Sequence, residues 1–178
     1  MELTQLQDKM FQPFIEKTIE SLEEMTTYQA RAGDPFEDQV EKFRFKGFAV
    51  ACEISGKIEG WLLMHHYIET SVAIGKKLLE VAFDAADEAL EKIDCHADTI
   101  PEELQEALDE WGNVAIGHSM KALANNKLDI RFHSPYFIRT DTDMSNMLSG
   151  INEIISVPIH VDGVGRFYLN LLCKQKTH

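Results

Sequence analysis

Two polar side chains one helical turn apart, Glu110 and Asn113, have the types and spacing to do chemistry together. Residues three apart on a helix project side by side, so a carboxylate lies next to a neutral amide. The carboxylate can pair with a cation, and the amide can donate and accept hydrogen bonds without adding charge. Gly117, one turn further on, leaves a gap where a partner could approach closely. Glu-x-x-Asn is a common sequence, however, and becomes a candidate site only in context.

The segment that carries these residues has the pattern of an amphipathic helix. Wound at about 100° per residue, it gathers an apolar stripe on one side and the polar candidates on the other. The stripe consists of Leu104, Leu108, Trp111, Ala115 and Ala122, and the polar side consists of Glu106, Glu110, Asn113 and Gly117. Thr99 is the expected N-cap, followed by Pro101 and acidic residues in the first turn. Gly112 and Gly117 each cost about 0.5–1 kcal/mol relative to Ala, so helix stability alone does not explain them.

Composition limits the classes of partner and the number of domains. A chain of 178 residues that is 44% hydrophobic can bury the core of one domain, spanning 1–178. Its 17 basic and 30 acidic side chains give 17 − 30 = −13, a charge that disfavours nucleic acid and an anionic membrane surface and favours a basic protein partner.

The cysteines and the apolar runs indicate where the protein resides. Three cysteines without Cys-x-x-Cys spacing, and a start without a signal-peptide pattern, predict neither disulfides nor export. No apolar run approaches the roughly 18 residues of a membrane span. We therefore expect a soluble, cytoplasmic protein.

The histidines do not have the spacing of metal ligands. No pair matches Cys-x2-Cys or His-Glu-x-x-His, so we predict no metal site and no cofactor of the protein's own. The histidines considered are His65-His66, His118, His133 and His96, which follows Cys95.

Periodicity predicts two similar halves joined by a linking helix. The predicted helices are 8–25, 69–93 and the helix that starts near 101, and Pro13 lies in the opening turns of the first. The predicted strands are 26–31, 43–54, 57–67, 128–132, 151–161 and 164–172. An exposed loop is expected at 140–146. The half-repeats run roughly over 8–67 and 101–174, with 69–93 as the linking helix. An offset of 100 maps Glu110 and Asn113 onto Met10 and Pro13, so one candidate site per chain is expected.

Two stretches resemble a known family. Pro13-Phe14-Ile15-Glu16-Lys17-Thr18, continued by Leu22-Glu23-Glu24-Met25, resembles the opening helix of CheX-type proteins in the CheC, CheX and FliY family of chemotaxis phosphatases. Glu110-x-x-Asn113, followed by Gly117, Lys121 and Leu123 and by the more distant Ser134-Pro135, resembles that family's signature. The resemblance covers most of the chain, from about Pro13 to Leu172. It departs at His118, where the family often has Asn, and at 85–105, which is longer than usual.

The resemblance implies both a fold and an activity. The fold is α+β, a pseudo-twofold duplication of CheC-like units of one helix and three antiparallel strands, here with an added helix. The activity is hydrolysis of the aspartyl phosphate on a CheY-type response regulator in chemotaxis or two-component signalling. Asn113 would position the water, Glu110 would pair with a cation of the regulator, and Glu106 and Gly117 would contact the partner. Mg2+ is expected on the regulator, and the protein is expected to be a homodimer.

Two other classes of function stay open. The first is a non-catalytic binding module for a response regulator or another signalling protein. His118 and the longer segment at 85–105 before the helix are compatible with this class. The second is a structural subunit of a flagellar switch, a class for which we would expect additional assembly segments.

Overall fold

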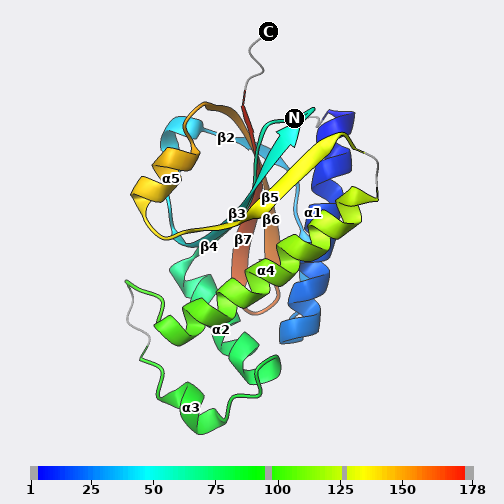
Figure 1. Ribbon diagram of the computed structural model, residues 1–178. Coiled ribbons are helices and arrows are strands. Elements are labelled where there is room, and N and C mark those ends of the chain that lie inside the picture. Colours follow the sequence, from blue (N-terminus) through cyan, green and yellow to red (C-terminus); the bar gives the residue numbers. More distant parts are fainter. Residues whose placement is uncertain (1–3, 95–97, 126–127, 175–178) are drawn as a thin grey trace.

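One antiparallel sheet organises the computed structural model, which describes residues 4–94, 98–125 and 128–174 (Figure 1). Its strands are β1 (Ala30–Ala32), β2 (Phe36–Asp38), β3 (Gly47–Gly56), β4 (Gly60–Tyr67), β5 (Ile130–Ile138), β6 (Ile151–Val161) and β7 (Gly165–Lys174). The strand order is β1-β6-β7-β4-β3-β5, and β2 also pairs with β6. The order is symmetric about the β7–β4 junction. Strand β5 of the second half pairs with the β3–β4 hairpin of the first half, and β1 of the first half pairs with the β6–β7 hairpin of the second. This arrangement agrees with the predicted α+β class of two similar units.

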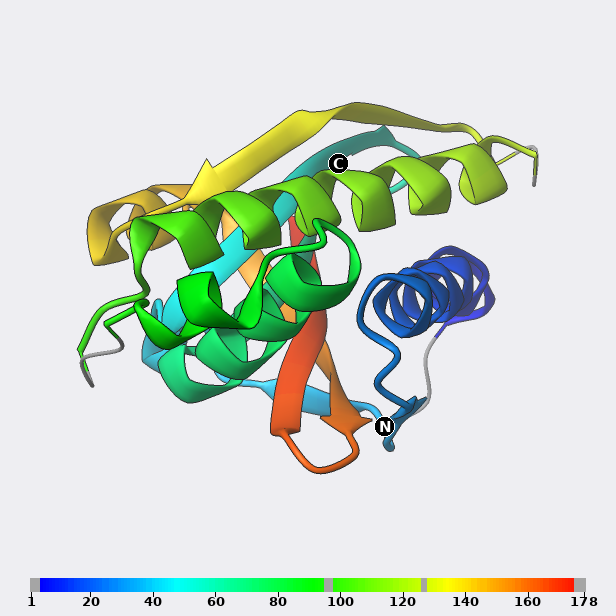
Figure 2. The same ribbon diagram turned by 90° about the horizontal axis from the view of Figure 1, so that it is seen from below.

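Three helices cover one face of the sheet. They are α1 (Gln5–Thr26), α2 (Ile68–Val81) and α4 (Glu102–Ala124), and α4 contacts both of the others (Figure 2). The short α3 (Asp87–Glu91) lies in the connection from α2 to α4. The opposite face carries the 3-10 turn η1 (Val40–Lys42) and α5 (Asp141–Met147).

Alternation along the strands divides the buried side chains between two cores. In β3, Phe48, Val50 and Cys52 point toward α1, α2 and α4, whereas Ala49 and Ala51 point toward α5. Both faces of this strand are therefore buried, which a nearly continuous apolar run makes possible. The core under the three helices is the larger, and it fixes the position of α4.

Helix α1 begins earlier than predicted. Thr4 and Gln7 form a capping box, in which the Thr4 hydroxyl accepts a hydrogen bond from the Gln7 backbone N–H. Pro13 therefore lies inside the helix, where a missing N–H and a crowded ring cost about 3 kcal/mol. The buried Met10 and Phe11 before it offset that cost, because both are 0% exposed.

The predicted linking helix over 69–93 is two helices. Helix α2 ends at Val81, where the N–H groups of Ala82 and Phe83 both donate to the Leu78 carbonyl. Asp84 then adopts a left-handed φ of 51°, and the Ala85 N–H donates to the Leu79 carbonyl. Past Val81 the helical pattern continues only through the exposed alanines Ala82 and Ala86 and the half-buried Leu90, so little packing is available to extend the helix.

Two further predictions in the second half were wrong. The expected loop at 140–146 is the helix α5, which a capping box between Thr140 and Asp143 starts and the buried Met144 and Met147 hold against the sheet. Strand β5 is longer than the predicted 128–132 and runs through Pro135, which lies opposite Cys52. An edge strand tolerates proline because one of its sides needs no N–H donor.

Candidate functional site

The candidate residues share the outer face of α4. Glu106, Glu110, Asn113 and Gly117 are all exposed, whereas Trp111, between the proposed pair, is 0% exposed. The helix thus presents Glu110 and Asn113 to solvent one turn apart, as the sequence pattern predicted.

Buried contacts fix the rotation of α4 beneath this face. The Trp111 Nε1–H donates to the Ser21 hydroxyl of α1 at 3.1 Å, and the indole ring packs edge-on against Phe167 with 5.8 Å between the ring centroids. Gly112 lies so close to the sheet that an added Cβ would stand 2.9 Å from Val50 Cγ1. An amide that must be held in place needs this kind of support from the side that faces the core.

The start of α4 differs from the prediction. The helix begins at Glu102, Pro101 occupies the N-cap position without a side-chain cap, and Thr99 lies outside the helix. Proline has no donor to lose at this position, and the carboxylates of Glu102 and Glu103 in the first turn complement the helix dipole.

Asp109, next to Glu110, makes hydrogen bonds within the protein, whereas the side chains of Glu110 and Asn113 make none in the described chain. Asp109 accepts hydrogen bonds from Arg139, at the end of β5, and from Gln105 at 3.1 Å. Within the described part of the chain, no hydrogen bond or ion pair occupies the side chains of Glu110 and Asn113. Both are therefore free to meet another molecule.

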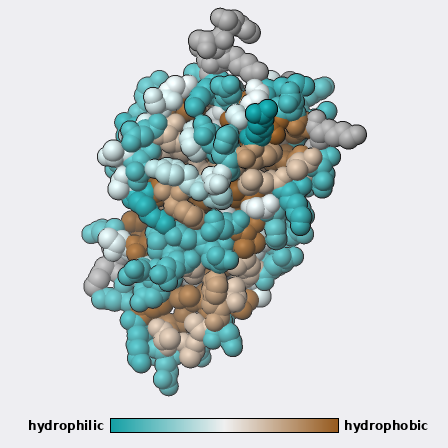
Figure 3. All heavy atoms as spheres, viewed as in Figure 1, coloured by the Kyte–Doolittle hydropathy of each residue, from teal (hydrophilic) through white to brown (hydrophobic). Residues whose placement is uncertain are grey.

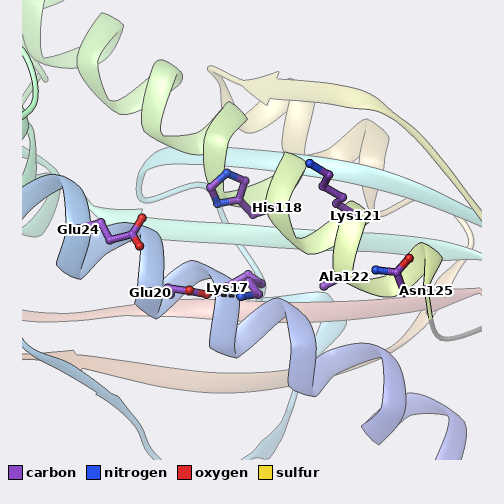
Figure 4. Close-up of a pocket in the computed structure, with 7 residues that line it drawn as sticks. All are labelled: Lys17, Glu20, Glu24, His118, Lys121, Ala122 and Asn125. Atoms are coloured by element: carbon purple, nitrogen blue, oxygen red, sulfur yellow. Dashed lines mark hydrogen bonds and ion pairs between the residues drawn. The ribbon is translucent and has the colours of Figure 1, made fainter.

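Charge changes sign along this exposed face. Glu103, Glu106 and Glu110 precede the neutral Asn113, and Lys121 lies beyond it. Past Gly117, a surface hollow of about 410 Å³ lies between α4 and α1 (Figure 4), and its lining residues are Lys17, Glu20, Glu24, His118, Lys121, Ala122 and Asn125. In Figure 4, His118 lies between the two helices, so its side chain borders this hollow.

A second hollow lies on the other side of the pair, between the end of α2 and the first turns of α4. It measures about 480 Å³ and is lined by Leu79, Phe83, Glu103, Glu106, Ala107 and Glu110. Phe83 was not predicted as a site residue, because the predicted helix over 69–93 ran through it without a break. A large aromatic residue within an otherwise small-residue run, Ala82 to Ala86, was the available signal.

The two glycines of α4 predict opposite effects of alanine on stability. Gly117→Ala is expected to raise the free energy of unfolding by about 0.5–1 kcal/mol, because a Cβ there meets nothing within 4 Å. Gly112→Ala is expected to lower it by about 1–3 kcal/mol through the clash with Val50. Urea unfolding of both variants measures the difference, and equal shifts would contradict the packing described for Gly112.

The first half of the chain lacks an equivalent pair. The buried residues of α1 and α4 match best at an offset of 97, which aligns Met10, Phe11 and Phe14 with Ala107, Leu108 and Trp111. The offset between the two helices is therefore 97 and not the predicted 100, and it puts Pro13 and Glu16 at the positions of Glu110 and Asn113. Neither residue supplies the missing group, so the conclusion of one pair per chain is unchanged.

The adjacent histidines belong to the two cores. His66 stacks on Phe167 with 4.3 Å between the ring centroids, and His65 packs near Phe43 on the other face. Burial, and then the nearby Lys46 charge, lowers the pKa of His65 to about 3. Burial, and then His65, lowers the pKa of His66 well below its ordinary value. Both rings are therefore neutral at physiological pH.

The described residues contain neither a cluster of metal ligands nor a helix that could span a membrane. In these ranges no group of three or more His, Cys, Asp or Glu side chains could hold a metal ion. The Cys95-His96 pair lies outside them. No helix of the described chain has the length and apolar content to cross a membrane.

Comparisons with known proteins place the fold. No family model matches the sequence, and no curated protein matches it significantly. Among solved structures, the chain is similar to CheX of the CheX–CheY–BeF3–Mg2+ complex from Borrelia burgdorferi, with a TM-score of 0.62 and 20% identity over 93% of this chain and 98% of that chain. It is also similar to a CheC-like protein from Shewanella sp. PV-4, with a TM-score of 0.66 and 15% identity over 94% and 98%.

A third structure extends the similarity to another branch. FliY from Thermotoga maritima matches with a TM-score of 0.62 and 13% identity, over 97% of this chain and 92% of that chain. The chain therefore has the CheX/CheC/FliY-type fold, and the predicted fold is confirmed.

Proposed function

We propose that this chain, which has the CheX/CheC/FliY-type fold, hydrolyses the aspartyl phosphate of a CheY-type response regulator. The observation that carries the proposal is the exposed pair Glu110 and Asn113, unpartnered within the described chain and presented by a helix that Trp111 and Gly112 hold in place. The similarity to CheX from a CheX–CheY complex supports the choice of partner.

The amide of Asn113 is suited to placing a water molecule. An acyl phosphate is already activated, so catalysis of its hydrolysis consists largely of positioning and electrostatic complementarity. An amide can accept a hydrogen bond from the water and donate another to the phosphoryl group, and it brings no negative charge that would repel that group. Mg2+ would belong to the regulator, where it would neutralise charge on the phosphoryl oxygens.

Glu110 is proposed to set the approach of the amide. Its carboxylate has no ion-pair partner in the described chain and lies one turn before Asn113, so it can pair with a cation beside the phosphorylated aspartate. Glu106 and Gly117 extend the contact on either side. Gly117 has open space above it, which a partner's backbone can enter.

The test is the rate of phosphate release from a regulator. CheY-type regulators of the same organism are phosphorylated with acetyl phosphate and Mg2+, and their dephosphorylation is followed with and without catalytic amounts of this chain. Acceleration with turnover is the expected result. If no regulator of the set loses its phosphoryl group faster, the enzymatic proposal fails.

A non-catalytic binding module is the second candidate. Two observations favour it: His118 lies where the resembled signature often has Asn, and the segment 85–105 that leads into α4 is longer than usual. A pure binder would leave the decay of the phosphorylated regulator unchanged or slow it, while a complex would still be seen. The same assay, paired with a direct binding measurement, separates the two candidates.

A homodimer is also proposed. Strand β5 is at the edge of the sheet, with one row of backbone N–H and C=O groups that no other strand of the described chain pairs. Such an edge can pair with a second copy about a twofold axis. Sedimentation equilibrium is expected to give twice the 20.3 kDa of one chain, and a mass of one chain at micromolar concentration would refute the dimer.

A further inference from the structure

We propose that the hollow between α2 and α4 is a docking groove that takes an apolar side chain of the phosphorylated regulator together with a neighbouring basic residue. The inference rests on the proposed partner and adds how that partner is selected. The groove is the 480 Å³ hollow beside Glu110 described above.

The groove combines an apolar floor with an acidic rim. Leu79, Phe83 and Ala107 supply the apolar surface, and the rim carboxylates come from Glu103, Glu106 and Glu110. The Phe83 side chain is 45% exposed, a large fraction for an aromatic residue on a surface rich in charge. In the view of Figure 3, hydrophobic residues gather on the lower part of the molecule, below a hydrophilic band that crosses its middle.

Backbone hydrogen bonds hold Phe83 in place. Its N–H donates to the Leu78 carbonyl at 3.2 Å, and the Ala85 N–H donates to the Leu79 carbonyl at 2.8 Å. The left-handed φ of 51° at Asp84 turns the chain directly after Phe83. A residue on such a preorganised turn loses little backbone freedom when a partner covers it.

The rim determines the charge of the occupant. Three carboxylates within two turns of α4 would repel an acidic segment and attract a basic one. Glu110 both lines the groove and belongs to the proposed pair. A residue bound in the groove would therefore fix the position of the phosphorylated aspartate relative to Asn113. The occupant is therefore a protruding apolar residue with a Lys or Arg beside it, on the surface that surrounds the phosphorylation site.

The decisive variant is Phe83→Ala, with Val81→Ala as its control. Val81 is also exposed, at 37%, but does not line the groove. Loss of an anchoring aromatic is expected to raise the KM for phosphorylated regulator, and the Kd for its BeF3–Mg2+ form, about tenfold. The kcat is expected to stay constant because the groove holds the substrate and the transition state equally. Val81→Ala is expected to leave all three constants unchanged.

The charge of the rim is tested with Glu103→Lys against Glu102→Lys. Both residues are exposed in the first turn of α4, and both reversals disturb the helix dipole equally, but only Glu103 lines the groove. Glu103→Lys is expected to slow association and to flatten its dependence on salt, whereas Glu102→Lys keeps a dependence close to that of the wild type.

The measurements separate failure of the groove from failure of the proposed enzyme. If the wild type binds regulator without hydrolysing it, the enzymatic proposal fails and the Kd values still decide the groove. If the wild type binds and Phe83→Ala binds equally well, the groove proposal is overturned while the function stands. If no CheY-type regulator binds the wild type, both are overturned. Unfolding curves for each variant exclude misfolding as the cause of a weaker Kd.

Discussion

Asn113→Ala is expected to lower the kcat for dephosphorylation of the regulator about 10²–10³-fold, the range typical when one positioning or stabilising group is removed. The Kd for the BeF3–Mg2+ form should change little, because the amide acts on the water rather than on docking. Stability should also be unchanged, since Asn113 is exposed and its side chain makes no hydrogen bond within the described chain. Single-turnover phosphate release measures the effect.

Asn152→Ala is the control for Asn113→Ala, and Glu110→Gln tests the other residue of the pair. Asn152→Ala removes another exposed amide on β6, far from α4 in sequence, and should leave kcat as it was. Glu110→Gln keeps the shape and removes the charge, so it is expected to raise the KM as well as lower the rate. Asn113→Ala that still dephosphorylates at the wild-type rate would remove the amide from the mechanism.

Acid is expected to destabilise the fold in a pH range set by His65 and His66. Their folded-state pKa values lie below the ordinary 6.5, so below pH 6.5 the unfolded chain binds protons that the folded chain does not. The free energy of unfolding therefore falls as the pH falls from 6.5 toward 3. Within that range each ring that stays neutral contributes on the order of 1 kcal/mol per pH unit.

Substitution of one ring tests this dependence. Neither ring nitrogen of His66 has a hydrogen-bond partner in the described chain, and its neighbours Phe48, Trp111 and Phe167 are aromatic. His66→Phe should stabilise the protein at pH 5 and roughly halve the slope, as read from urea unfolding at pH 7, 6 and 5. Identical slopes for His66→Phe and wild type would show that other groups set the acid limit.

The outward face of α4 could be predicted from the sequence because helical period is a strong signal in a long segment. Leu104, Leu108, Trp111 and Ala115 are all buried, and their spacing alone places Glu110 and Asn113 on the opposite side. Gly112 is different: the sequence marked it as a conflict with helix propensity, and the structure supplies the reason, a close approach to Val50. Such an approach is a tertiary fact that propensity does not contain.

The ends and breaks of elements were harder to predict, for physical reasons that differ between them. The predicted α1 missed Thr4 and Gln7, whose capping box lies upstream of the apolar stripe. The helix over 69–93 was overextended because Ala82 and Ala86 continue the apolar pattern after Val81 although both are exposed. The groove beside Glu110 could not be predicted at all, since it depends on where Phe83 lies relative to α4.

The exchange of outer strands has a consequence for biosynthesis. The β3–β4 hairpin of the amino-terminal half receives its outer neighbour only when β5, residues 130–138, has left the ribosome, and β1 and β2 must wait for β6. Much of the sheet therefore closes through contacts between residues far apart in the chain, which slows folding. The amino-terminal half exposes unsatisfied hydrogen-bonding edges throughout that interval, and a nascent chain of this topology is a natural client for chaperones.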